Sequence, residues 1–205
     1  MASIKFFDSH THMFGGFEDV PAKIVDSKQI DGINLILAHP SEKNYEKLNA
    51  KAFALAKKYG KKVQLALWID PLKEGGPAEA VKYLDAHRDI RGLKFHPTGD
   101  KWQITEKIAG PYLDIAMERD LFVITHTQPT EGQHAICYYD LLKKRPELRF
   151  IVGHSSTIEE SIFLSVCCNI QCGSATPALN TCKGVLKQSF FRGVVFMILS
   201  TLLIA

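Results

Sequence analysis

The sequence predicts an α/β fold, a (β/α)8 barrel of the TIM type that is short at its C-terminal end. Short apolar runs recur at intervals of about 30 residues, the length of one strand–helix unit, and amphipathic helical patterns lie between them. The runs are nearly continuous in apolar character, which is typical of parallel strands covered on both faces. Strand followed by helix, repeated along the chain, favours a parallel sheet.

Eight strands are predicted in chain order. Six begin near Ile4, Ile33, Val63, Gly92, Phe122 and Phe150, and two further runs lie at Asn169–Gly173 and Val194–Leu199. A TIM barrel usually takes ~250 residues, with ~200 as the lower limit. We therefore expect seven to eight strands and no closing helix. An open doubly wound sheet is the structural alternative, although no glycine-rich phosphate loop follows the first strand.

Helices are predicted between the strands. Glu46–Tyr59 carries an apolar stripe and ends before Gly60, a suitable C-cap. Pro77–His87 starts with a proline, which is favoured at the first helical position. The other predicted helices are Gly110–Arg119, Ala135–Lys144 and Thr157–Cys168. No linker interrupts the pattern, so we interpret residues 1–205 as a single domain.

The composition is that of a globular protein that can bury a core. Of the 205 residues, 46% are hydrophobic and 23% are charged, which excludes the disordered and fibrous classes. The net charge of +3 gives no reason to expect a nucleic acid or an anionic membrane as a partner. The five cysteines are unevenly spread and no signal-peptide pattern is present, so we expect a cytoplasmic protein.

Residues 161–205 are atypical because they contain no aspartate and no glutamate. The last 13 residues, Gly193–Ala205, carry no charged side chain at all. This run is shorter than the ~20 residues that span a bilayer, so we interpret it as a buried strand or an aggregation-prone segment rather than an anchor.

Six of the eight histidines occur where apolar strand runs end: His10, His12, His39, His96, His126 and His154. In parallel α/β proteins, ligands bind at the C-terminal ends of the strands. Histidines at equivalent ends of separate strands would therefore converge on one mouth. His39 and His96, each followed by proline, are equally consistent with simple strand caps.

The spacing of His10 and His12 predicts a pair of metal ligands. Residues two apart in a strand point to the same side, and imidazole nitrogen suits zinc and other divalent first-row ions. A further ligand from His126 would leave room for a metal-activated water. A lone His-x-His is common by chance, and the combination with His126 and His154 carries the prediction.

Four motifs in this order resemble the amidohydrolase superfamily: DSHTH at 8–12, GLKFHP at 92–97, VITHT at 123–127 and IVGHSS at 151–156. The resemblance is to the amidohydrolase-related (amidohydrolase 2) branch of metal-dependent TIM-barrel hydrolases and decarboxylases. It covers about three quarters of the chain, from Ile4 to Ser156. It therefore implies a TIM barrel with a metal site at its mouth.

The resemblance also implies roles for single residues. His10 and His12 match the metal pair on the first strand, and His126 matches the ligand on the fifth. His154 matches a histidine that binds a second metal or orients substrate and water. Lys94 matches the position of a carbamylated bridging lysine in binuclear members, whereas in this branch one metal is usual and an inward lysine binds a substrate carboxylate.

The substrate itself is not predicted by the sequence. We expect His96, Ser155 and Trp102 to contact a small molecule, and Trp102 is equally consistent with covering the edge of the core. The unclosed edge of the barrel favours a homo-oligomer.

The chain departs from the family pattern at the eighth strand, where an aspartate normally binds the metal and accepts the proton of the attacking water. Val194–Leu199 contains none. Three explanations compete. The end of the reading frame is altered, or the protein is a variant without this base, or the barrel is completed by another chain. Asp8, Asp70 or Asp100 could approach the mouth from other strands, although none matches the family position.

These observations predict a metal-dependent hydrolase in which an activated water attacks an amide, ester or lactone carbon. Zinc is the expected ion. Non-oxidative decarboxylation of a small carboxylic acid is the alternative reaction. A third hypothesis, from a different class, is an inactive relic that binds a metal or a small ligand, because the eighth-strand aspartate is missing.

Overall fold

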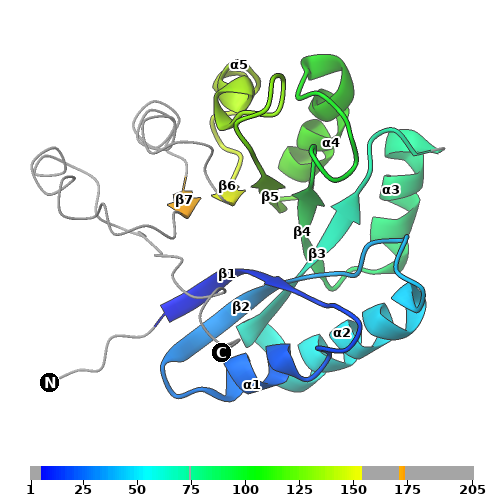
Figure 1. Cartoon of the computed structure of the whole chain (residues 1–205), viewed down its shortest axis with the longest axis vertical. Helices are drawn as coiled ribbons and strands as arrows, with labels where there is room; N and C mark the ends of the chain where they lie inside the picture. Colours follow the sequence, from blue (N-terminus) through cyan, green and yellow to red (C-terminus); the bar gives the residue numbers. More distant parts are fainter. Residues whose placement is uncertain (1–5, 74, 154–170, 174–205) are drawn as a thin grey trace, which may run out of the picture.

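The computed structural model describes residues 6–73, 75–153 and 171–173 of the chain (Figure 1). Seven parallel strands lie side by side in chain order. They are β1 (Phe6–His12), β2 (Ile30–Ile36), β3 (Val63–Ile69), β4 (Ile90–Phe95), β5 (Phe122–His126), β6 (Phe150–Gly153) and β7 (Gln171–Gly173). The predicted TIM-type barrel is therefore confirmed, and the doubly wound alternative is excluded because the seven described strands pair in chain order without a crossover.

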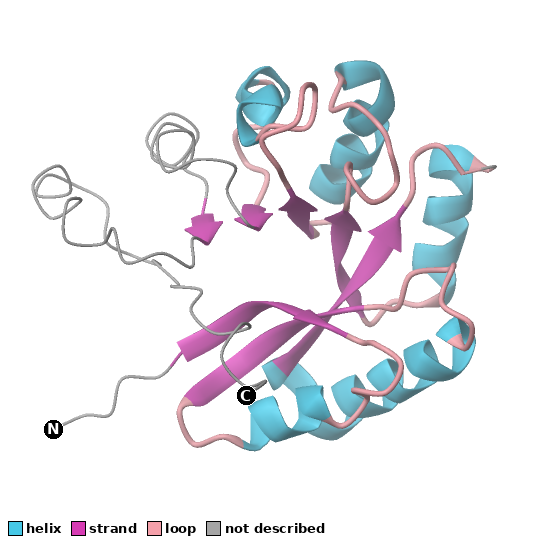
Figure 2. Cartoon of the chain, in the orientation of Figure 1, coloured by secondary structure: helices cyan, strands magenta, loops and turns pink. Residues whose placement is uncertain are grey.

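Helices connect successive strands and lie on the outer side of the curved sheet (Figure 2). They are α1 (Val20–Asp26), α2 (Tyr45–Tyr59), α3 (Gly76–Ala86), α4 (Glu106–Glu118) and α5 (Tyr139–Lys143), with short 3₁₀ turns at Gly60–Lys62 and Ala135–Tyr138. None of the helices in the described parts of the chain is both long and apolar enough to cross a membrane.

The first strand extends further than its apolar run. β1 continues to His12, so His10 and His12 lie within the strand rather than after it. Its pairing with β2 is irregular between Asp8 and Thr11. The carboxylate of Asp8 accepts hydrogen bonds from the backbone N–H of His10 and the hydroxyl of Thr11, both at 2.9 Å. These bonds stabilise the irregular backbone that carries the two histidines.

Two predicted helices differ from the structure, and one helix was not predicted. α4 begins at Glu106, where Thr105 caps the backbone N–H of Ile108, and it contains Pro111 in its interior. The predicted helix began only at Gly110, because a proline is disfavoured in the interior of a helix. The predicted helix Ala135–Lys144 is a 3₁₀ turn followed by the short α5. α1 is absent from the predicted helices.

Three predicted elements concern the C-terminal part of the chain. The short β7 confirms a strand within Asn169–Gly173. The predicted helix Thr157–Cys168 and the predicted eighth strand Val194–Leu199 lie outside the described residues.

Side chains of the strands alternate between two separate apolar groups. Those that face the helices form the large core, which includes Ile33, Leu35, Leu93, Val123 and Val152. Those that face the barrel axis form a small second group, Ile36, Ala66, Phe122, Ile124 and Ile151, with Trp68 packed against it. The alternation follows from the two-residue period of a strand. It fixes which side chains at the strand ends point into the mouth.

We predict that Gly92→Ala destabilises the barrel interior. A Cβ at Gly92 on β4 would overlap the ring of Phe122 on β5. Overpacking of this kind costs about 1–3 kcal/mol, measured as a lower urea midpoint of unfolding. The double variant Gly92→Ala/Phe122→Leu should recover most of the loss. An unchanged midpoint for the single variant would show that the ring moves aside freely.

Candidate functional site

Three nitrogen atoms converge inside the barrel. The Nε2 atoms of His10 and His12 lie 3.1 Å apart, and the Nζ atom of Lys94 on β4 lies 2.8 Å from Nε2 of His10. Lys94 is completely buried and His10 is only 4% exposed. The structure therefore brings together the two predicted strand-one ligands and the predicted inward lysine.

A glycine on β6 makes room for the ring of His10. A Cβ at Gly153 would lie 2.8 Å from Nδ1 of His10. Any larger residue at this position would push the imidazole away from His12 and Lys94. The glycine of the IVGHSS motif thus has a steric role in the site, which sequence reasoning missed.

Burial determines the charge of Lys94. Removal from water lowers the pKa of the ammonium from about 10.5 to about 7, and the negative charge of Asp100 opposes this shift. Lys94 can therefore lose its proton much closer to neutral pH than an exposed lysine can. It can accept a proton, donate one, or hold an anionic group.

His126, the third predicted ligand, lies in an aromatic stack. Its ring is parallel to that of His96, with centroids 4.0 Å apart, and His96 stacks in turn on Trp68 at 5.4 Å. Nε2 of His126 lies 3.2 Å from the side-chain amide of Gln128. Within the part of the chain that the structure describes, no three His, Cys, Asp or Glu side chains are grouped closely enough to hold an ion.

The His10–His12 pair nevertheless fits a metal ion by its donor chemistry. Two imidazole nitrogens bound to one tetrahedral zinc at ~2.0–2.1 Å would be about 3.3 Å apart. The observed Nε2–Nε2 separation is 3.1 Å. The two nitrogens are therefore separated by a distance close to that between two ligands of one ion.

A carboxylate and a further histidine lie beside the stack. Asp100, in the loop after β4, accepts a hydrogen bond from the indole N–H of Trp68 at 3.0 Å. Its other oxygen lies 3.2 Å from Nε2 of His39. Burial raises the pKa of Asp100, and the nearby Asp70 raises it further, whereas Trp68 and His39 lower it. Of the three carboxylates considered from the sequence, Asp100 is the one that contacts this group of rings.

Trp68 is the central residue that sequence reasoning missed. It contacts His12, His39 and His96, with ring centroids 5.8, 4.9 and 5.4 Å away. Its inward direction follows from alternation along β3. The signal was its position two residues before Asp70 at the end of an apolar run.

The remaining predicted site residues have different outcomes. Trp102 is 2% exposed and packs edge-on against Phe95 in the main core, so it covers the core. His154 and Ser155 lie outside the described residues.

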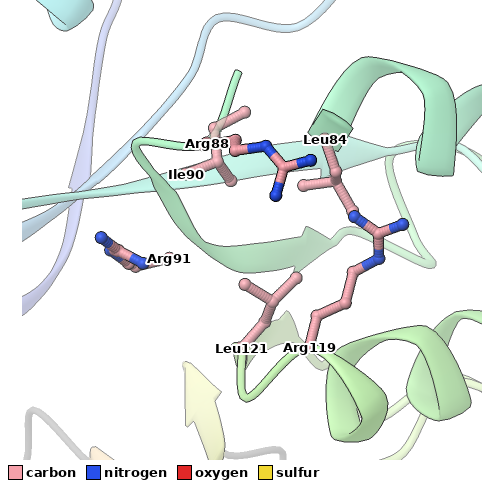
Figure 3. Close-up of a pocket in the computed structure, with 6 residues that line it drawn as sticks. All are labelled: Leu84, Arg88, Ile90, Arg91, Arg119 and Leu121. Atoms are coloured by element: carbon pink, nitrogen blue, oxygen red, sulfur yellow. The ribbon is translucent and has the colours of Figure 1, made fainter. Parts of the chain in front are cut away.

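A separate cavity of about 410 Å³ lies at the opposite ends of the strands (Figure 3). It is located where β4 and β5 begin and α3 ends. Its lining residues are Leu84, Arg88, Ile90, Arg91, Arg119 and Leu121. Because the N-terminal face of such barrels serves stability rather than catalysis, we do not assign the cavity to the functional site.

Comparison with known proteins shows similarity in structure only. No family model matches the chain, and no curated protein matches it in sequence. A TatD homologue from Escherichia coli K12 matches with a TM-score of 0.63 and 17% identity, over 92% of this chain and 76% of that one. Dihydroorotase from Campylobacter jejuni matches with a TM-score of 0.60 and 17% identity, over 88% of this chain and 58% of the enzyme.

A third similar structure is 5-carboxyvanillate decarboxylase from Novosphingobium aromaticivorans, solved with bound manganese. It has a TM-score of 0.56 and 11% identity, over 89% of this chain and 84% of the decarboxylase. The fold is a TIM barrel. At these identities the similarity shows the fold, and it does not transfer an activity to this chain.

We predict that Lys94→Met stabilises the metal-free protein at pH 7 by roughly 2–4 kcal/mol, since one pKa unit corresponds to ~1.4 kcal/mol. The unfolded chain binds a proton at this lysine up to about pH 10.5, whereas the folded chain releases it above about pH 7. Stability of the unsubstituted protein should therefore rise between these two values.

The measurement is the free energy of urea unfolding between pH 6 and pH 10, after treatment with a chelator. The rise should be absent from the variant. Parallel curves for the two proteins would mean that Lys94 is not buried as an amine.

Proposed function

We propose that the chain is a metal-dependent hydrolase with one divalent ion, zinc, held by His10, His12 and His126. The main support for this proposal is that the Nε2 atoms of His10 and His12 lie close together beside a fully buried Lys94. The similar TIM-barrel structures add support, since they include a dihydroorotase and a decarboxylase solved with bound manganese. His126 is included because it ends β5, the strand next to Lys94.

The ion would supply a Lewis acid that activates water and polarises a carbonyl at neutral pH. The chain's own residues would do the rest. Lys94 as ammonium would hold a carboxylate or carbonyl oxygen of the substrate, and its burial would strengthen that interaction. We propose that His154 orients the substrate carbonyl and that His96 and Ser155 contact the substrate.

The expected reaction is attack of water on an amide, ester or lactone carbon of a small molecule. Decarboxylation of a small carboxylic acid is retained as a second candidate. The specific observation in its favour is the extent of the match to the decarboxylase, which covers most of both chains. Lys94 suits this reaction as well, since an ammonium near pH 7 can hold a carboxylate.

We predict that His12→Ala loses bound metal. Removing a direct ligand should weaken affinity by at least about 100-fold, since changes beyond the direct ligands already cost 10–100-fold. Zinc per chain is measured by elemental analysis after dialysis against a weak chelator. His87→Gln is the matched control, because His87 packs on Phe53 and Tyr83 outside the mouth and should retain zinc. Equal metal in both variants would contradict the assignment.

We further predict that the metal-loaded protein turns over at least one substrate class. A panel of amides, esters and lactones tests hydrolysis, and a panel of aromatic and aliphatic carboxylic acids tests decarboxylation by release of carbon dioxide. Activity should disappear with a chelator and return with zinc or manganese. Metal binding without any turnover would favour the inactive relic.

A further inference from the structure

Asp100 is a carboxylate beside the rings of the mouth, and it is not among the proposed metal ligands. Its side chain is 5% exposed, although it lies in a loop. One oxygen accepts the indole N–H of Trp68 at 3.0 Å, and the other faces Nε2 of His39 at 3.2 Å. A buried carboxylate is costly unless it is paired. The hydrogen bond from Trp68 and the contact with His39 therefore offset part of the cost of burying this carboxylate.

The hydrogen bonds of His39 determine which of its nitrogens carries a proton. Nδ1 accepts the backbone N–H of Ser41 at 3.1 Å and lies 2.5 Å from the Ser41 hydroxyl. An imidazole nitrogen that accepts is unprotonated, so the neutral ring carries its hydrogen on Nε2. That nitrogen is the one facing Asp100. It is buried and makes no well-aligned hydrogen bond within the described residues. Nε2 of His39 is therefore close to Asp100 but does not form a well-aligned hydrogen bond with it.

The pair adjoins the proposed metal residues through Trp68. The indole that binds Asp100 lies 5.8 Å, centroid to centroid, from the ring of His12. The charge of Asp100 also acts on Lys94 and raises its pKa against the effect of burial. His39 is 26% exposed and so connects the buried carboxylate with solvent.

We propose that Asp100, assisted by His39, is the proton acceptor of this site. The proposal rests on the hydrolase function proposed above. It assigns to Asp100 the role for which no acidic residue after Glu160 is available, and it selects Asp100 from the three aspartates considered in the sequence.

The step balances as a general-base reaction. The oxygen of water forms a bond to the carbonyl carbon, and one of its protons passes to the Asp100 carboxylate. As the bond to the leaving nitrogen or oxygen breaks, the carboxyl group returns that proton to the leaving atom. Asp100 is thereby regenerated as a carboxylate, and the other proton of the water stays with the carboxylic acid product. The contact with Nε2 of His39 holds the carboxylate in position. No oxidant or further reactant is needed.

The electrostatics fit this role. Burial and the like charge of Asp70 raise the pKa of Asp100, whereas Trp68 and His39 limit the rise. Lys94 is a further charged group that interacts with Asp100. A base is most effective when its pKa approaches the working pH. The surroundings of Asp100 move its pKa in that direction.

The first test compares Asp100→Asn with Asp85→Asn. Asn keeps the size of the side chain and an acceptor for Trp68 but cannot take a proton, so kcat should fall about 10²–10⁴-fold, with zinc content unchanged. Asp85 pairs with Arg119 on the far side of the barrel, and its variant should keep normal kcat. Activity of Asp100→Asn within threefold of the parent, with zinc bound, would overturn the proposal and leave the hydrolase function intact.

The second test does not depend on activity. Carbon-13 NMR of the Asp100 carboxyl, assigned by its loss in Asp100→Asn, should give a pKa above the ordinary aspartate value. His39→Gln should raise it further, because His39 lowers the pKa of Asp100. If the pKa of Asp100 is that of an ordinary aspartate and does not change in His39→Gln, the proposed pair of Asp100 and His39 is overturned. This result does not require that any substrate be turned over. Absence of zinc from the unsubstituted protein would instead contradict the proposed function.

Discussion

The buried contact between Lys94 and His10 is the constraint on which the site depends. An amine with no solvent exposure lies 2.8 Å from an imidazole nitrogen inside a parallel barrel. Such a group is tolerated only if it is neutral or paired, so the barrel interior at this level must remain polar. The apolar side chains that face the barrel axis, among them Ile36, Ala66 and Phe122, form a separate layer that does not include Lys94 or His10. The barrel thus separates an apolar filling from a polar mouth.

The rim of the mouth is built from rings rather than from charges. His126, His96 and Trp68 form one continuous stack, and Trp68 also contacts His12 and His39. Stacked rings are rigid and expose few polar atoms. One of them, the indole N–H of Trp68, donates a hydrogen bond to Asp100. This arrangement can hold a carboxylate with a raised pKa close to the proposed metal ligand His12 without making it a ligand.

The two ends of the barrel are chemically different. Five histidines (His10, His12, His39, His96 and His126) gather with Lys94 and Asp100 where the strands end, whereas the end where β4 and β5 begin carries arginines and leucines around a cavity. This polarity is usual in parallel barrels, because loops after the strands are free to vary while those before them maintain the fold. The similar structures show the same fold at low identity. The chemistry of this chain therefore has to be argued from its own side chains.

The sequence by itself determined the strand positions, the parallel barrel and the pairing of His10 with His12, because these depend on local periodicity. Local patterns were insufficient at Pro111, where packing keeps a helix continuous through a residue that usually ends one.

Only the tertiary structure decided which groups from different strands meet. Trp68, His39 and Asp100 are separated by about 30 residues from one to the next, and nothing in their local sequences indicates that they touch. Trp102 was assigned to the core and His126 to the ring stack for the same reason. Periodicity fixes the side of a strand to which a residue points, but contact depends on strand order, sheet curvature and loop path, which are global properties of the fold.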